Sequence, residues 1–349
     1  MKNYVLIGII LAFTGCDSAA PSVWQSNPGY TDAGQTDSYT GYSEFGSDAG
    51  AAPEQADSPY EEADEEPDEE QLEAPAEADQ APVKKLVLAS TKVSRCNGNQ
   101  VDADTVKELI ALSDTSQPLS LLDIKARIDG IAARFGACED RRGLFAEVYR
   151  VITRRALETL DDGVLQYNGW GEDFIIDFAE RYLFNLRLHL VGGKPNYGWQ
   201  RYYSLAQMDN VSMTRVAVTG MVVHLAIDLP YCLVDIDTKE KHKPDYFLFG
   251  DKLGEGAEEL IEALDEVYGA QANDMLRGFF LGKWVDGLFG AETTTNLSFQ
   301  TIRLKSWNNR WFLQKWWGGP IAKSEMSASF WTIDAILAGL DASGVLDDD

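Results

Sequence analysis

Hydrophobic positions recur at helical spacing along most of the chain beyond residue 84. Apolar side chains at positions i, i+3, i+4 and i+7 predict helices that bury one face. Alternating strand patterns are scarce here, so we expect an all-α, multi-helix bundle-like domain over residues 84–349. The pattern predicts helices over residues 103–114, 120–135, 142–160, 172–191, 199–208, 212–235, 243–268, 271–289, 297–316 and 324–340.

Short segments between these ranges carry the signals that end one helix and start the next. Ser120 and Asp123 have the spacing of a capping box. Gly192-Gly193 and Gly318-Gly319-Pro320 interrupt the apolar pattern further along the chain. These breaks predict a bundle whose helices are joined by short connections.

One predicted helix differs from the others because it is apolar on nearly every side. Residues 216–234 read VAVTGMVVHLAIDLPYCLV, which suits either a membrane span or a helix inside a protein core. In a bilayer, an aspartate near the middle of the span costs about 3 kcal/mol on insertion scales. A helix covered on all sides by other helices avoids that cost. We therefore expect this segment to be the buried central helix of the bundle.

Two polar side chains, His224 and Asp228, lie within this apolar segment. They are four residues apart and share one face of the helix, while Pro230 removes a backbone donor beside them. One interpretation is a structural pair, hydrogen-bonded to each other, to a tyrosine or to an arginine. The other is a site in which Asp228 orients His224 as a general base. His224 and Asp228 are therefore the candidate catalytic residues.

Charged groups elsewhere in the domain bear on this pair. A lone buried carboxylate is costly, so we expect one of four arginines to counter Asp228: Arg181, Arg187, Arg215 or Arg303. A single metal ion is an alternative partner, held by His224, Asp228 and one carboxylate from Asp235, Asp237 or Asp245. The chain has three histidines and no His-Glu-x-x-His, Gly-x-Ser-x-Gly or phosphate-loop motif, so we expect no cofactor.

Four motifs in the domain resemble a bacterial family, domain of unknown function 5995, from about Leu121 to Leu313. They comprise Gly220-Met221 with His224-Leu-Ala-Ile-Asp228-Leu-Pro230, Phe178-Ala-Glu-Arg181-Tyr182 with Trp199, His242-Lys-Pro-Asp245-Tyr246, and Arg303 with Trp307. The resemblance implies a helical fold and supplies no activity. Its motif residues are the candidate ligand-binding residues: Arg181, Tyr182, Trp199, His242, Asp245, Arg303 and Trp307.

The N-terminus has the pattern of a lipoprotein signal peptide over residues 1–15. Lys2 is followed by an apolar run too short to span a bilayer, and Phe-Thr-Gly precedes Cys16 as in a lipobox. We expect Cys16 to be lipidated and to hold the chain on a bacterial membrane, with the domain facing the periplasm or the exterior. A plain secretory signal is the alternative.

Residues 16–83 have the composition of a disordered acidic linker. The segment holds 18 Asp and Glu and no Lys or Arg, in a chain whose formal charge is -26. Such a segment has little to bury and repels itself, so we expect a tether between membrane and domain. The acidic balance also argues against nucleic acid as a partner, since binding it requires Lys and Arg.

Cysteine and tryptophan usage adds two expectations. Cys96 and Cys138 flank the first two predicted helices and form either a disulfide or free thiols, while Cys232 is expected to be a buried free thiol. Five tryptophans near the end of the chain predict helix packing, with a sugar-stacking platform as the alternative: Trp307, Trp311, Trp316, Trp317 and Trp331.

These observations predict a membrane-anchored cell-envelope lipoprotein whose domain binds an unknown ligand or envelope protein. The alternative is a hydrolase acting on a lipid, phosphoester or cell-wall substrate through His224 and Asp228. A solvent-sealed pair favours the binding module, and an open cleft reaching His224 favours the hydrolase.

Overall fold

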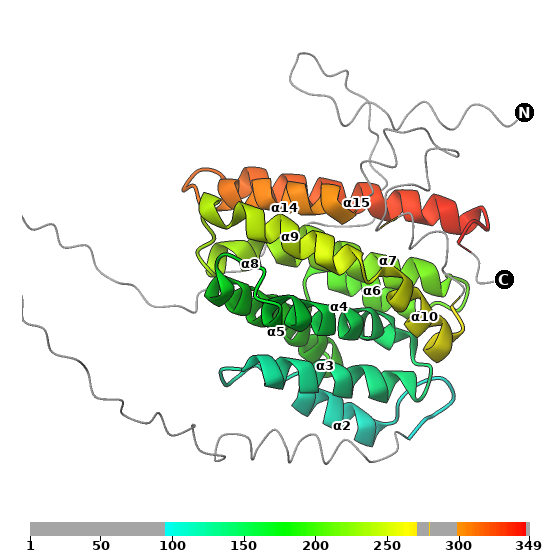
Figure 1. Cartoon of the computed structure of the whole chain (residues 1–349). Helices are drawn as coiled ribbons and strands as arrows, with labels where there is room; N and C mark the ends of the chain where they lie inside the picture. The colour runs from blue at the N-terminus through cyan, green and yellow to red at the C-terminus, as the bar shows by residue number, and fades with distance from the viewer. Residues whose placement is uncertain (1–94, 271–278, 280–298, 347–349) are drawn as a thin grey trace, which may run out of the picture. The chain divides into compact units, whose positions relative to one another are not determined.

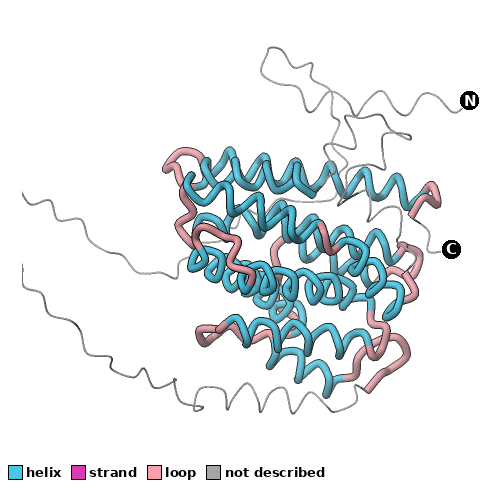
Figure 2. Tube along the Cα trace, in the orientation of Figure 1, coloured by secondary structure: helices cyan, strands magenta, loops and turns pink. Residues whose placement is uncertain are grey.

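The structure is a computed structural model that describes residues 95–270, 279 and 299–346. The predicted signal peptide, Cys16 and the predicted tether lie outside these residues, as does most of the predicted helix over 271–289. The described part is helical and contains no β-strand, which confirms the all-α prediction (Figure 2).

Eleven α-helices and three short helical turns follow one another along the described chain. In order they are α2 (Ala103–Leu112), α3 (Leu121–Gly136), a 3-10 turn (Arg141–Gly143), α4 (Leu144–Asp161), α5 (Asn168–Leu190), α6 (Tyr197–Ala206), α7 (Met213–Val223), a π turn (His224–Asp228), α8 (Leu229–Asp235), a 3-10 turn (Glu240–His242), α9 (Lys243–Gly254), α10 (Ala257–Tyr268), α14 (Phe299–Leu313) and α15 (Gly319–Ala342).

The apolar segment forms the central helix, as predicted. α7, the π turn and α8 run as one helix over Met213–Asp235, which is long and apolar enough to cross a membrane but has 94% of its apolar window buried inside the protein. It packs against α4, α5, α6, α14 and α15. Figure 1 shows α14 and α15 along one side of the domain and α2 and α3 along the opposite side, with α7 and α8 between them. Burial among helices is how the protein accommodates this composition.

Local signals placed several helix ends correctly. Ser120 caps α3, and its side chain and that of Asp123 accept each other's backbone N–H groups, which confirms the capping box. The predicted start of the last helix is wrong: α15 begins at Gly319, five residues earlier, because Pro320 suits the first turn of a helix.

The prediction of a single helix over residues 243–268 is wrong. The chain forms two helices, α9 and α10, separated at Glu255-Gly256. Glycine weakens a helix interior, and Gly256 also brings the backbone close to Arg155 of α4, where a Cβ would lie 3.3 Å from its Cγ. The tertiary contact therefore favours a break that the apolar pattern does not reveal.

The two sequence alternatives for the cysteines are resolved. Cys96 and Cys138 form a disulfide that ties the segment before α2 to the end of α3. Cys232 is a buried free thiol, as expected. Burial raises the pKa of the Cys232 thiol well above its usual range, so the group is protonated and unreactive.

Candidate functional site

The centre of the Met213–Asp235 helix is widened into a π turn at His224–Asp228. Pro230 follows this turn and has no N–H to donate to the carbonyl of Ala226, so the regular hydrogen-bond ladder cannot continue. Ser306 of α14 donates its hydroxyl to the carbonyl of Leu225 at 2.5 Å. Irregular turns of this kind within long helices are frequent at functional sites.

The π turn holds His224 and Asp228 in direct contact. The imidazole Nδ1 lies 3.0 Å from Asp228 Oδ2, and both residues are only 3% exposed. Two donors from the start of α6 complete the carboxylate's partners: Trp199 Nε1 donates to Oδ2 at 2.8 Å and Asn196 Nδ2 donates to Oδ1 at 3.1 Å. The carboxylate thus accepts three hydrogen bonds inside the core.

Burial determines the charge state of the imidazole. Desolvation lowers the pKa of His224, although the hydrogen bond to Asp228 and its charge act in the opposite direction. The ring is therefore neutral at pH 7, and the contact is a hydrogen bond from Nδ1–H to a carboxylate rather than an ion pair. This tautomer leaves a lone pair on Nε2, which is buried and has no hydrogen-bond partner among the described residues.

Polar groups of α6, rather than an arginine, compensate the charge of Asp228. Asn196 caps α6 by accepting the N–H groups of Gly198 and Trp199, and its amide also donates to Asp228. The carboxylate therefore sits by the positive end of a helix dipole.

The prediction that an arginine is the counter-ion of Asp228 is wrong. Within the described chain, Arg181 pairs with Asp177 and Asp235. Arg187 donates a hydrogen bond to the carbonyl of Ile110 and lies near Asp114. Arg215 pairs with Asp334 and Asp341. Arg303 donates to the carbonyl of Tyr246. Each of the four guanidinium groups binds these other acceptors, which leaves the Asp228 carboxylate to the neutral donors of α6.

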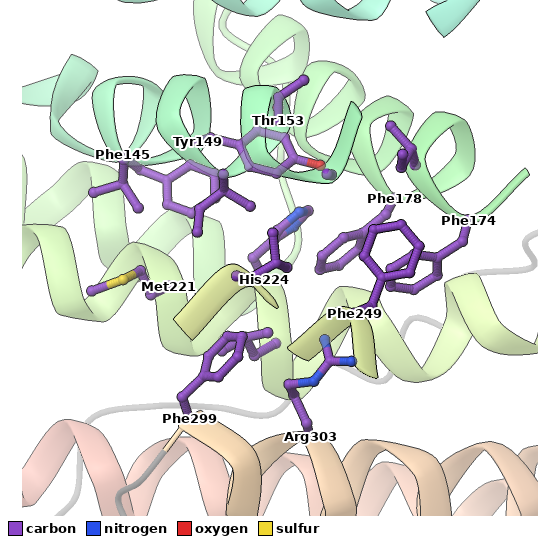
Figure 3. A pocket seen from close by; sticks show the side chains of 16 residues that line it. Phe145, Tyr149, Thr153, Phe174, Phe178, Met221, His224, Phe249, Phe299 and Arg303 are labelled. Carbon is purple, nitrogen blue, oxygen red and sulfur yellow. The ribbon is translucent and has the colours of Figure 1, made fainter. Parts of the chain in front are cut away.

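Aromatic rings enclose the imidazole. Phe178 of α5 stacks on it with ring centroids 3.6 Å apart and planes 12° apart. Tyr149 and Phe145 of α4 present their rings to it at steep angles, with centroids 4.8 Å and 5.3 Å away. Figure 3 shows His224 between Tyr149 and Phe178. These contacts hold the ring in one orientation and exclude water from most of its surface.

A cavity of about 50 Å³ opens beside this ring. Its walls are apolar apart from His224, Arg303 and the hydroxyls of Tyr149 and Thr153 (Figure 3). The remaining lining side chains are Phe145, Val148, Ile152, Ala156, Phe174, Ile175, Phe178, Met221, Leu225, Phe249, Leu253 and Phe299. Since a water occupies roughly 10–15 Å³ by this kind of measure and needs two or more polar partners, the cavity suits an apolar group better than water.

Arg303 lies on the opposite wall of the cavity from His224 (Figure 3). Its guanidinium sits 4.1 Å from the ring centroid of Tyr246 and donates to the Tyr246 carbonyl, while the Tyr246 hydroxyl donates to the Arg303 carbonyl at 2.8 Å. Its Nε is buried without a partner among the described residues. The charge is thus fixed at the wall by α9.

Two other predicted ligand-binding residues are core residues outside the cavity wall. Tyr182 is fully buried against Phe145 and Trp199. Trp307 is buried between Tyr246 and Arg310. The guanidinium of Arg310 lies 4.0 Å from the ring centroid of Trp307.

His242 and Asp245 lie at the entry to α9 and support the start of α5. Asp245 accepts the N–H groups of Gln166 and Tyr167, at 3.0 Å and 2.8 Å. The ring of His242 stacks on Trp170 with a centroid distance of 5.2 Å. The structure therefore brings His224, Asp228, Trp199 and Arg303 to one region, and places His242 and Asp245 elsewhere.

The metal alternative is wrong for the residues described here. They contain no group of three or more His, Cys, Asp or Glu side chains that could hold an ion. Asp235 pairs with Arg181, Asp237 pairs with Lys239, and Asp245 accepts backbone N–H groups. None of the three carboxylates reaches the His224–Asp228 pair to complete a ligand set.

Sequence reasoning missed Asn196 and the aromatic enclosure formed by Phe145, Tyr149 and Phe178. Asn196 carried a readable signal, since asparagine before a helical pattern is a common N-cap. The aromatic residues carried none, because ordinary core residues have the same helical spacing.

Comparison with known proteins connects this domain to one family. The sequence model of a family of unknown function, DUF5995, matches residues 121–338, which include every residue of the site described above. Searches of curated proteins and of solved structures each found no match.

Proposed function

The chain belongs to the DUF5995 family of unknown function, and from its own site we propose that its helical domain binds a small apolar ligand, or the apolar end of an amphipathic one. The cavity beside His224 is the binding site. One observation carries this proposal: His224, whose Nε2 has no hydrogen-bond partner among the described residues, lines a cavity whose other walls are almost wholly apolar. Sites for small molecules commonly combine apolar walls with a few polar groups that orient the ligand.

The free lone pair on Nε2 specifies the polar part of the ligand. A neutral imidazole with its proton on Nδ1 accepts a hydrogen bond at Nε2. A ligand with a hydroxyl group would satisfy this acceptor, whereas an ether of the same size would leave it unpaired. The geometry therefore favours an alcohol, or another neutral hydroxyl compound, over an ether.

A cavity-filling variant tests the proposal directly. We expect Ala156→Leu, which adds carbon atoms to the cavity wall, to weaken binding of 1-butanol at least about tenfold by calorimetry. Ala156→Ser, which adds one atom, is the matched control and should bind as the native protein does. Native protein should also prefer 1-butanol over its isomer diethyl ether by roughly three- to tenfold. No heat of binding with either compound, or equal binding by Ala156→Leu, would contradict the proposal.

The chain's place in the cell is a second part of the proposal. Cys16 is the lipid attachment point, and residues 16–83 tether the domain to a bacterial membrane. The supporting observations are the apolar run before Cys16 and the acidic, proline-containing segment after it. The acyl chains of the anchor insert in the bilayer and leave the domain free at the membrane surface.

Detergent phase separation of expressing cells tests the anchor. We expect native protein in the detergent phase and Cys16→Ser in the aqueous phase, because each lost acyl methylene removes about 0.8 kcal/mol of membrane affinity. Cys232→Ser, which alters a buried thiol, should partition like the native chain. Native protein that incorporates no labelled palmitate in growing cells would exclude lipidation of Cys16, whatever the partitioning of Cys16→Ser, which keeps the apolar residues 1–15.

A hydrolase is the second candidate function, and the His224–Asp228 pair is the observation that favours it. Asp228 orients the ring through Nδ1 and leaves Nε2 as the basic nitrogen, as general-base catalysis requires. Among lipid, phosphoester and cell-wall substrates, the apolar walls favour a lipid ester. The 3% exposure of His224 favours the binding module instead, since the pair is sealed from solvent.

Ester hydrolysis distinguishes the two functions. A hydrolase would cleave p-nitrophenyl butyrate about 10²- to 10⁴-fold more slowly with His224→Gln than with native protein. His189→Gln is the matched control, since His189 stacks on Tyr203 outside the cavity. We expect equal rates for all three proteins, which would exclude the hydrolase.

A further inference from the structure

The turn between α14 and α15 presents a cluster of large apolar side chains to solvent. We call it the tryptophan tip, comprising Trp311, Lys315, Trp316, Trp317 and Ile321. Among the described residues, four of the twelve exposed large hydrophobic side chains belong to it, with exposed fractions of 42% for Trp311, 94% for Trp316, 44% for Trp317 and 49% for Ile321. Contiguous exposed apolar groups mark interaction surfaces, whereas single ones are ordinary. The packing role predicted from sequence holds for Trp307 but is wrong for Trp316.

The tip is ordered by its own contacts. Gly318 N donates to the Lys315 carbonyl at 3.0 Å, and a Cβ on Gly318 would collide with the carbonyl of Phe312. Trp317 packs edge-on against Trp311 and Phe312, with both centroid distances at 6.1 Å. The turn therefore has a defined conformation in which Trp316 projects outward.

Two exposed lysines accompany these aromatic rings in an otherwise acidic protein, whose formal charge is -26. The other cations of residues 299–324 lie elsewhere: Arg303 and Arg310 are buried, and Lys305 pairs with Glu325. Lys315 and Lys323 are exposed, and Lys315 Nζ lies 5.0 Å from the ring centroid of Trp311. A negatively charged surface would be attracted to this end of the α14–α15 hairpin and repelled by the acidic remainder of the chain.

We propose that the tryptophan tip inserts into the headgroup interface of a bilayer that contains anionic lipids. Tryptophan concentrates at this interface because its ring is apolar while its N–H requires a polar partner. Lysine beside it can bury its methylene groups and keep its ammonium among lipid phosphates. The tip combines both features at an exposed turn. This contact is separate from the ligand cavity and from the lipid on Cys16.

Vesicle binding by the full chain carrying Cys16→Ser tests the tip without any acyl anchor. The probes are vesicles of phosphatidylcholine mixed with phosphatidylglycerol, and the readouts are sedimentation and quenching of tryptophan fluorescence by brominated acyl chains. We expect Trp316→Ser/Trp317→Ser to weaken association at least about tenfold and to lose most of the quenching. Residues 1–15 are the same in every protein compared, so a difference in vesicle association between two variants comes from the substituted residues.

Two matched variants identify what the tip recognises. Trp331→Ser removes an exposed tryptophan of α15 outside the tip and should leave association unchanged. Lys315→Ser should weaken association about fivefold on vesicles with phosphatidylglycerol and not on pure phosphatidylcholine. Equal association of the double tryptophan variant would overturn the proposal. Binding of peptidoglycan fragments or of a protein by the tip, with no vesicle association, would overturn it too.

Discussion

Replacing Asp228 with alanine is expected to lower the free energy of unfolding by about 3–5 kcal/mol. The carboxylate accepts hydrogen bonds from Trp199, Asn196 and His224; the first and last of these are buried, and Asn196 is half-buried. Removing the carboxylate leaves two buried N–H groups and one half-buried N–H group without their acceptor. Urea unfolding followed by circular dichroism measures the loss.

Two further substitutions isolate the cause of this loss. Asp228→Asn keeps the shape but turns one acceptor into a donor, which then faces Asn196 Nδ2. Asn196 cannot rotate its amide without losing the α6 cap, so we expect an intermediate loss of about 1–3 kcal/mol. Asp235→Ala removes a largely exposed carboxylate from the same helix and should cost less than about 1 kcal/mol. If Asp228→Ala were no more destabilising than Asp235→Ala, the described network would not stabilise the fold.

Removing the disulfide between Cys96 and Cys138 is expected to lower the free energy of unfolding by roughly 3–4 kcal/mol. Cys96 and Cys138 are 42 residues apart in sequence, and the bond restricts the unfolded chain over that whole loop, which contains α2 and α3. The double variant Cys96→Ser/Cys138→Ser, unfolded in urea beside the native protein, gives the magnitude.

Reductant supplies an independent measurement of the same bond. Dithiothreitol should destabilise the native protein and the Cys232→Ser control alike, because Cys232 is a buried free thiol. It should have no effect on the double variant. A change below about 1 kcal/mol in the double variant would show that other contacts near the bridge restrain this segment, such as the 3.1 Å hydrogen bond from Val101 N to Asp140 Oδ2.

Features of the fold that depend on neighbouring residues were predictable from the sequence. Apolar spacing located α2 to α8 because a helix buries residues that recur at a local period. Apolarity on all sides identified the central helix, and a spacing of four residues placed His224 and Asp228 on one face of it. The capping box at Ser120 is equally local.

Features that depend on distant residues were not predictable. The donors to Asp228 come from α6, 29 and 32 residues away in the chain, and the expected arginines pair with other carboxylates. The break between α9 and α10 depends on the approach of Gly256 to Arg155 of α4. The enclosure of His224 by Phe145, Tyr149 and Phe178 requires α4 and α5 to pack on the π turn.

Helical periodicity and the burial of apolar faces follow from local spacing, so an all-helical domain with a buried polar pair in its central helix was predictable from the sequence. Three features were visible only in the folded domain: the groups that bind Asp228, the lack of a partner for His224 Nε2 among the described residues, and the exposure of Trp316 but not of Trp307. Each of these depends on which helix lies opposite a given side chain, and that arrangement is selected by the packing of the whole core.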